Sequence, residues 1–157
     1  MSGAIVTHDA VSGAVVRALV PIAAGQPIYD ERMLQDFNEP CFFVIEPSVT
    51  EEKQLDRYRM YEHKIEVSYF PKPQAMTDRR LLSEWRQLLF SALRKIDVDA
   101  YMDSEGKIVR LPVRAHAAEC RWIEDHLVYY ANYRLRCREV VDEGVIMQKL
   151  IENQNIK

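Results

Sequence analysis

The chain has 157 residues, with 48% apolar and 29% charged side chains, a size and composition that allow about two-thirds of the unfolded surface to be buried around one core. No apolar run approaches the roughly 20 residues that span a bilayer, and the N-terminal residues lack the features of a secretory signal, so we expect a soluble protein that is not exported by that route. The 21 basic and 24 acidic residues give a net charge of −3, which argues against free DNA as a ligand because nucleic-acid binders carry an excess of positive charge.

The N-terminal part of the chain predicts a helix and then a short strand. Thr7 can cap the helix by accepting a hydrogen bond from a free amide, and the helix should end in the break over residues 21–25. A short strand is expected over residues 27–30, before a polar stretch at 31–40. The helix is predicted from apolar residues at helical spacing: Val11, Val15, Ala18, Leu19 and Ile22.

Two strands are predicted next. Residues 41–46 form a compact apolar run between two prolines, and their Phe and Val content favours a buried strand. Residues 48–55 are polar and are expected to form a loop. Residues 58–70 then alternate in polarity until Pro71 and Pro73, which end the strand because proline donates no backbone hydrogen bond. The side chains predicted to share one face are Tyr61, His63, Ile65, Val67 and Tyr69.

A long amphipathic helix is predicted over residues 78–96. Its polar face is rich in arginine, and its apolar residues recur at helical spacing, so one face should pack and the other should meet solvent. The apolar face consists of Leu81, Leu82, Trp85, Leu88, Leu89, Leu93 and Ile96.

The C-terminal third predicts further extended structure. Residues 99–106 indicate a strand end and a turn, and residues 107–118 indicate an extended arm in which Pro112 must lie at an edge or a bulge. The turn-like residues 124–126 predict a hairpin between a segment that ends near Trp122 and a last long strand. The side chains of that strand predicted to face the core are Leu127, Tyr129, Ala131, Tyr133, Leu135 and Cys137.

After Gly144 we expect a short helical tail over residues 145–151, within a flexible C-terminal region at 143–157. No period of 20 to 50 residues repeats and no linker divides the sequence, so we expect one domain over residues 1–157. The order of elements indicates an α+β fold, with a mainly antiparallel sheet of about four strands and helices packed on one face.

Sequence motifs for catalysis are absent. The five glycines are far apart, so no phosphate-binding loop exists, and there is no serine elbow, zinc-binding helix or Cys-x-x-Cys pair. The spacing of His116 and Cys120 would suit a metal site on a helix, but their segment is predicted to be extended. His63 fits a hydrogen-bonded core or interface histidine better than a general base. We assign no catalytic, cofactor-binding or metal-binding residue.

The three cysteines, Cys41, Cys120 and Cys137, are widely spaced, which argues against a disulfide framework and indicates a reducing compartment.

Arginine and tyrosine side chains gather in the two long strands. Arg134, Arg136 and Arg138 form a row on one face of the last strand, which either pairs with Glu62 and Glu66 across the sheet or contacts another subunit. Core packing accounts for about half of the tyrosines, whereas Tyr130 and Val128 lie opposite the core set and indicate a partner or a covering helix. The tyrosines in these strands are Tyr58, Tyr61, Tyr69, Tyr129, Tyr130 and Tyr133.

Three segments carry a resemblance to a known family. Residues 38–47 (NEPCFFVIEP), 57–71 (RYRMYEHKIEVSYFP) and 127–135 (LVYYANYRL), together with the two predicted helices, resemble the small tail terminator, or tail-completion, proteins of long-tailed bacteriophages. The likeness covers most of residues 6–140, and its most specific part is the aromatic strand between prolines paired with a strand that ends in Tyr-Phe-Pro. It departs from the family pattern at residues 124–126, where a glycine-containing turn is expected, and over 107–121.

The resemblance implies a structural protein of the virion rather than an enzyme. Members form a homo-oligomeric ring, usually a hexamer, in the tail neck: the ring caps the head-proximal end of the tail tube, stops its polymerisation and offers a surface to head–tail connector or neck proteins. Genomic DNA passes through the lumen without specific binding, no membrane is involved, and assembly takes place in the host cytoplasm. Such a subunit needs one interface that closes the ring and another that matches the tube.

On this basis, the strands at 41–46, 58–70 and 127–138 are expected to form a rigid wedge with the helix at 81–96 on its core face, while extended arms make the contacts. Because arginine and tyrosine are enriched in interfaces, we expect the subunit or tube contacts at Arg57, Arg59, Tyr61, Arg110, Arg114, Arg134 and Arg136. The alternatives are another neck component, either a connector or a stopper; a small metal-dependent enzyme; and a bacterial interaction module.

Overall fold

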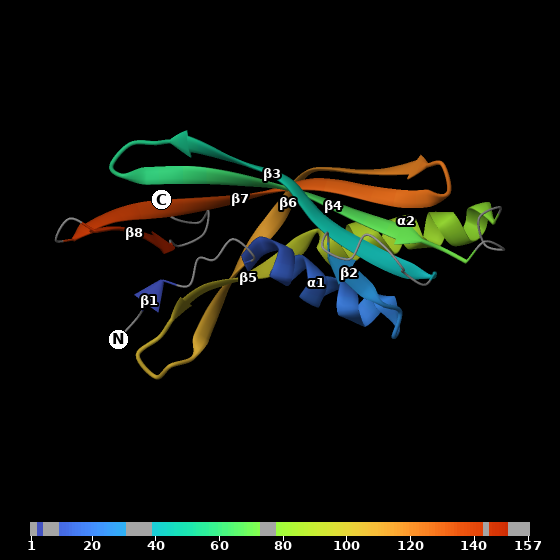
Figure 1. Cartoon of the computed structure of the whole chain (residues 1–157), viewed down its shortest axis with the longest axis horizontal. Helices are drawn as coiled ribbons and strands as arrows, with labels where there is room; N and C mark the ends of the chain where they lie inside the picture. The colour runs from blue at the N-terminus through green and yellow to red at the C-terminus, as the bar shows by residue number, and fades with distance from the viewer. Residues whose placement is uncertain (1–2, 5–9, 31–38, 73–77, 143–144, 151–157) are drawn as a thin grey trace.

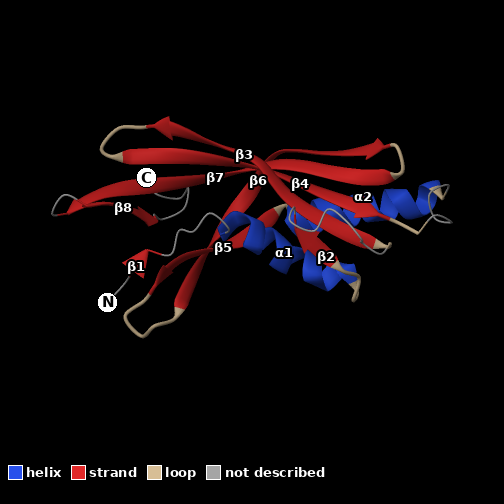
Figure 2. Cartoon of the chain, viewed as in Figure 1, coloured by secondary structure: helices blue, strands red, loops and turns tan. Residues whose placement is uncertain are grey.

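Two helices cover one side of a curled, twisted sheet, so the predicted α+β class is confirmed (Figures 1 and 2). The computed structural model describes residues 3–4, 10–30, 39–72, 78–142 and 145–150, with side chains for 10–30, 39–72 and 78–137. The predicted cap Thr7, most of the polar stretch at 31–40, Pro73, Gly144 and residues 151–157 lie outside this range. No helix among the described residues is long and apolar enough to cross a membrane.

The elements follow one another with short connections. The helices are α1 (Ala10–Ala23) and α2 (Arg79–Leu93). The strands before α2 are β1 (Gly3–Ala4), β2 (Ile28–Asp30), β3 (Cys41–Lys53) and β4 (Tyr58–Phe70). The strands after it are β5 (Lys95–Met102), β6 (Ile108–Ile123), β7 (His126–Asp142) and β8 (Val145–Leu150).

The sheet is larger than the four strands expected from the sequence. Among the described residues it has eight strands in the order β1-β5-β6-β7-β4-β3-β2, with β8 paired to β7. The pair β2–β3 is parallel and the other pairs are antiparallel, so the sheet is mixed but mainly antiparallel. β1 and β8 lie near each other, although they come from opposite ends of the chain and do not pair (Figure 1).

β6 connects two parts of the sheet. Its first half pairs with β5, and its second half, from Ala115, pairs with β7. The register shifts between His116 and Glu119, where Ala117 has a φ of 55°. Pro112 lies opposite Asp97 of β5 and has no strand on its other side among the described residues, which confirms its predicted edge position.

The core lies between the helices and the inner face of β3, β4 and β7. In β4 and β7, strand alternation turns inward the side chains that were predicted to face the core. α2 packs onto them. Trp85 of α2 has its ring centroid 5.5 Å from Phe42 of β3 and 4.4 Å from Tyr69 of β4. These contacts confirm that the three strands adjoin with the second helix on their core face.

α2 begins as predicted but ends earlier. The Asp78 carboxylate accepts hydrogen bonds from the amides of Arg80 and Leu81 at 3.1 and 3.2 Å, which satisfies two free donors of the first turn. The helix ends at Leu93, so the prediction that it reaches Ile96 is wrong. Ile96 is buried, but it points inward from β5, which follows the helix after one residue.

Two other predictions are corrected by strand pairing. Residues 48–53, expected in a loop, continue β3 after a register shift between Ile45 and Ser48, because their backbone pairs with β4. Residues 145–150, expected in a helix, form β8 along the edge of β7 that β6 leaves uncovered. Pro21, expected in the break after the first helix, lies inside α1.

The strands extend well beyond the helices at one end of the molecule (Figure 1). We call this region the strand arm; it consists of residues 48–53 of β3, 58–64 of β4 and 132–142 of β7, together with β8. The turn between β3 and β4 lies at its tip. The arm is therefore the part of the sheet that is stabilised mainly by strand pairing rather than by helix packing.

Candidate interaction surfaces

One surface covers the outer face of the strand arm, opposite the core. Arg134 donates to Glu62 at 2.7 Å, which confirms the pairing across the sheet considered for the arginine row; Glu66 instead lies opposite Tyr130. The guanidinium of Arg136 lies over the aromatic ring of Tyr58, 4.1 Å from its centroid. Among the described residues, the Nε atom of Arg136 is buried without a hydrogen-bond partner, which is costly for a donor.

The other face of the arm carries a second group. Tyr61 donates its hydroxyl hydrogen to Glu51 at 2.7 Å, and Arg59 Nε lies 3.8 Å from the same carboxylate. Burial raises the pKa of Tyr61 well above its ordinary value, and the hydrogen bond to Glu51 is the second cause of this rise. Tyr61 therefore stays neutral, and its hydroxyl holds Glu51 over this face.

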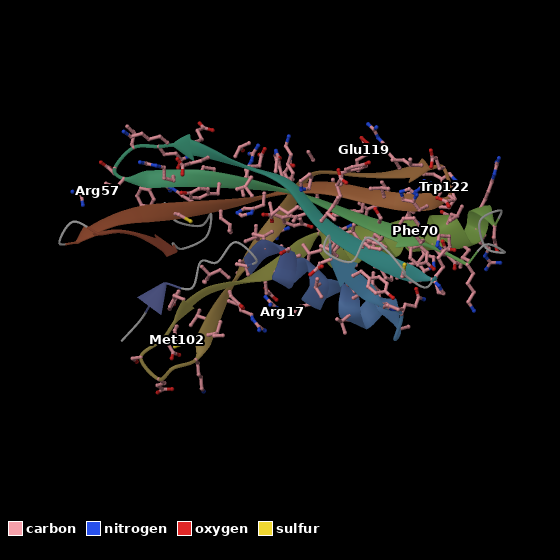
Figure 3. All side chains as sticks on the ribbon, viewed as in Figure 1. Arg17, Arg57, Phe70, Met102, Glu119 and Trp122 are labelled. Carbon is pink, nitrogen blue, oxygen red and sulfur yellow. The ribbon has the colours of Figure 1, made fainter. Side chains whose placement is uncertain are left out.

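The turn at the tip of the arm presents exposed side chains. Asp56 and Arg57 both have positive φ angles, of 56° and 66°, which non-glycine residues seldom adopt. The turn closes through hydrogen bonds between Gln54 N and Tyr58 O, at 2.9 Å, and between Tyr58 N and Leu55 O, at 3.2 Å. Leu55 is 86% exposed, and Arg57, also exposed, lies at the far end of the molecule (Figure 3).

Arg110 and Arg114 lie on the other part of the sheet. Arg110 donates to the Asp99 carboxylate at 2.7 Å, and Arg17 of α1 reaches the same carboxylate at 3.4 Å and the Asp97 carbonyl at 2.7 Å. Arg114 is exposed opposite Lys95. Arg110 is thus part of an ion-pair cluster that ties α1 and β6 to β5.

The seven predicted contact residues therefore do not form one patch. Five of them lie on the strand arm, on its two faces and at its tip, and the other two lie on β6. Sequence reasoning missed Leu55, Glu51 and Arg17; only Leu55 gives a signal, as a single large apolar residue in a polar turn.

Comparison with protein families gives one match, the family described as phage tail terminator protein, over residues 11–144. This range covers most of the chain and includes α1 from its second residue, α2 and strands β2 to β7. The chain belongs to the phage tail terminator family. A comparison with curated proteins gives no match.

Membership of this family confirms the resemblance found in the sequence. Phage tail terminators are structural components of the virion, which directs attention to surfaces for other tail or neck components. The matched residues contain the whole strand arm except β8, and they contain all seven predicted contact residues.

In this tail terminator, the histidines and the cysteine considered for catalysis or metal binding are parts of the sheet. His63 is nearly buried, with its Nδ1 3.2 Å from Glu46 at the register shift of β3. His116 is exposed on β6, where Cys120 points to the opposite face. Within the described residues, no three His, Cys, Asp or Glu side chains are placed to hold a metal ion.

All three cysteines are free thiols. Burial is the main cause that raises their pKa values from 9.0 to about 11, so each is a poor nucleophile near neutral pH. Cys41 and Cys137 are almost fully buried and act as small apolar side chains.

Half of the six tyrosines of β4 and β7 lie in the core, as expected, although Tyr61, predicted on the core face, is only half-buried. Tyr69, Tyr129 and Tyr133 are buried in the core, whereas Tyr58, Tyr61 and Tyr130 are half-buried. Tyr130 lies on the outer face with the Arg121 guanidinium 5.9 Å from its ring centroid. Val128 is buried on that same face, so it needs no partner to explain it.

Proposed function

We propose that this tail terminator assembles into a closed ring, most simply a hexamer, that caps the head-proximal end of the tail tube. The ring stops tube polymerisation and offers its other side to head–tail connector or neck proteins, while genomic DNA passes through the lumen. It belongs to the tail neck of the virion, is assembled in the host cytoplasm, and requires no catalysed reaction.

The strand arm is the main support for this proposal. It extends past the helices (Figure 1), its tip exposes Leu55, and its outer face carries the Arg136 guanidinium over the Tyr58 ring. Arginine and tyrosine are the residues that most often dominate interfaces. The four contact residues most directly supported by this arrangement are Arg57, Arg59, Tyr61 and Arg136, with Arg110, Arg114 and Arg134 as further contacts.

A tube-assembly experiment tests the function. Purified protein is added to polymerising tail tube subunits, and tube length and end structure are measured by negative-stain electron microscopy. We expect shorter tubes with a cap at one end, in the absence of heads, and light scattering should give a mass of several subunits. Tubes that grow unchanged with the protein unattached would contradict the proposal, whereas attachment without termination would indicate a connector or a stopper.

A charge reversal tests the contribution of the arm tip. Arg57→Glu should weaken assembly or tube capping, and Arg79→Glu, an equally exposed arginine at the start of α2, is the matched control. Both changes should leave the stability of the subunit within about 0.5 kcal/mol, because both sites are on the surface. Equal effects of the two variants on capping would contradict a specific role for the tip.

A further inference from the structure

β3 has an open edge over most of the strand arm. β2 pairs with it only at residues 42–44, and residues 48–53 pair with β4 on one side and with no described strand on the other. Because Gln54 N donates to Tyr58 O, alternation along an antiparallel ladder turns the amides of Val49, Glu51 and Lys53 toward the open edge. This edge presents a row of backbone donors and acceptors to another strand.

Other edges of the sheet are obstructed. Along β5, Arg17 donates to the carbonyl of Asp97 at 2.7 Å, so a side chain of α1 occupies that edge. Along the first half of β6, Pro112 removes one backbone donor. Within the described residues, residues 48–53 of β3 have neither a proline nor a helix side chain that occupies their open edge.

β8 provides a second edge without a paired strand on the opposite side of the same arm, within the described residues, although β1 and β5 come close to β8. It pairs with residues 137–142 of β7, and no described strand pairs with its other side. The arm is therefore a four-stranded sheet in the order β3-β4-β7-β8, bounded by two unpaired strands. The open part of β3 and the whole of β8 each contain six residues.

We propose that β8 of one subunit pairs with residues 48–53 of β3 in the next subunit, so that the sheet continues around the ring. This inference rests on the proposed ring. The four strands of the arm alternate in direction, so β8 runs opposite to β3. When neighbouring copies have the same orientation along the ring axis, the new pair is antiparallel and the alternation continues without interruption.

The offset between the two edges fits a closed sheet. Lys53 lies level with Arg59, Cys137 and Leu150 across the arm. Residues that pair lie on the same face of a sheet, so Leu150, which is level with Lys53, can lie opposite Val49 of the next copy, which is a shift of four residues, or about 13 Å, across four strands. Four strands are about 19 Å wide, so the strands would tilt by roughly 35° from the ring axis, within the range of closed barrels.

This contact is heterologous, because it joins two different edges, and it is used once by every subunit. Closure leaves no unpaired edge in this part of the sheet, which is the usual way in which closed sheets avoid further growth. Side-chain contacts at the arm tip and outer face can then join the ring to other tail components.

Disulfide trapping tests the pairing. This register places Thr50 opposite Lys149 of the neighbour in a pair without mutual backbone hydrogen bonds, where Cα atoms are about 4.5 Å apart and a disulfide can form. Full-length protein carrying Thr50→Cys and Lys149→Cys, with Cys120→Ser, is oxidised and run on a non-reducing gel. We expect a ladder of covalent multimers up to the complete ring, and no product above a dimer from either single-cysteine variant.

A proline variant and a matched alanine variant test the β3 edge without relying on that register. Val49→Pro removes an outward amide, and Val49→Ala keeps it while also shortening this half-exposed side chain. We expect light scattering to show at least a tenfold weaker assembly for Val49→Pro and little change for Val49→Ala. Circular dichroism and thermal melting of both variants must match those of the original protein, and Lys53→Pro with Lys53→Ala repeats the comparison.

The outcomes separate this inference from the proposed function. A ring that assembles with neither the disulfide ladder nor sensitivity to Val49→Pro would overturn the edge pairing and leave the ring intact. Sensitivity to Val49→Pro without the ladder would overturn β8 as the occupant. A protein that forms no ring and does not cap tubes would contradict the proposed function itself.

Discussion

Tyr133 of β7 donates its hydroxyl hydrogen to the carbonyl oxygen of Leu93, the last residue of α2, at 2.7 Å. The Tyr129 hydroxyl lies 3.1 Å from that of Tyr133 and 3.4 Å from the same carbonyl. The final carbonyls of a helix have no partner within it, so these two buried side chains satisfy an acceptor that would otherwise be costly. They also fix the end of the helix against the strand that leads into the arm.

Tyr133→Phe should lower the free energy of unfolding by about 1–3 kcal/mol, because a buried carbonyl loses its closest donor. Urea denaturation followed by circular dichroism measures the change. Tyr130→Phe is the matched control on the outer face and should cost less than about 0.5 kcal/mol. An equal loss for both variants would show that the Leu93 contact has no special weight.

Alkaline pH should destabilise the protein through the same pair. Burial raises the pKa of Tyr129 from its ordinary value of 10.0 to about 12 and raises that of Tyr133 in the same direction. Above pH 10 the unfolded chain releases these protons while the folded chain keeps them, so stability present below pH 10 is lost as the pH rises toward 12.

The expected slope is up to about 1.4 kcal/mol per pH unit for each tyrosine. The buried thiols add a similar loss from pH 9 upward, since their pKa values also rise on folding. Tyr129→Phe should therefore flatten the decline of stability above pH 10. The pH dependence of stability between pH 7 and 8.5 should stay as it is in the original protein. Absorbance at 295 nm provides an independent titration of the folded protein.

The sequence predicted the elements that bury one face. β4 was predicted with its observed bounds, and the inward side chains of β7 were predicted correctly, because alternation is unambiguous where one face is in the core. The end of α2 was missed since Ile96 continues the helical apolar spacing by chance while lying in β5. No glycine or proline marks that junction; Arg94 keeps a helical conformation with φ of −59°.

The strand arm could not be predicted in the same way. Residues 48–53 are mostly exposed, so their hydrophobicity carries no period, and only pairing with β4 makes them a strand. β8 likewise depends on an edge of β7 that becomes available because the residues of β6 before Ala115 pair with β5 instead. The individual arginines and tyrosines could be identified from composition, but their distribution over two faces and a tip depends on this non-local pairing.

The N-cap of α2 offers a local test of stability. Asp78→Ala should lower the free energy of unfolding by about 1 kcal/mol, because the amides of Arg80 and Leu81 lose their acceptor. Asp78→Asn retains an oxygen acceptor and should cost clearly less. Thermal melting of the three proteins checks the order, and a loss that is equal for Ala and Asn would assign the effect to charge rather than to the cap.

The pair between Glu62 and Arg134 separates stability from assembly. Both side chains are partly exposed, so Arg134→Ala should cost only about 0.2–1 kcal/mol of stability, and a double-mutant cycle with Glu62→Ala should give a coupling in the same range. If Arg134 also contacts another tail component, Arg134→Ala should weaken tube capping by far more than this loss explains, and Glu62→Ala should not. Identical capping by both variants at equal stability would show that Arg134 serves only the sheet, and would leave Arg136, with its unpaired buried Nε, as the arginine of that face to test next.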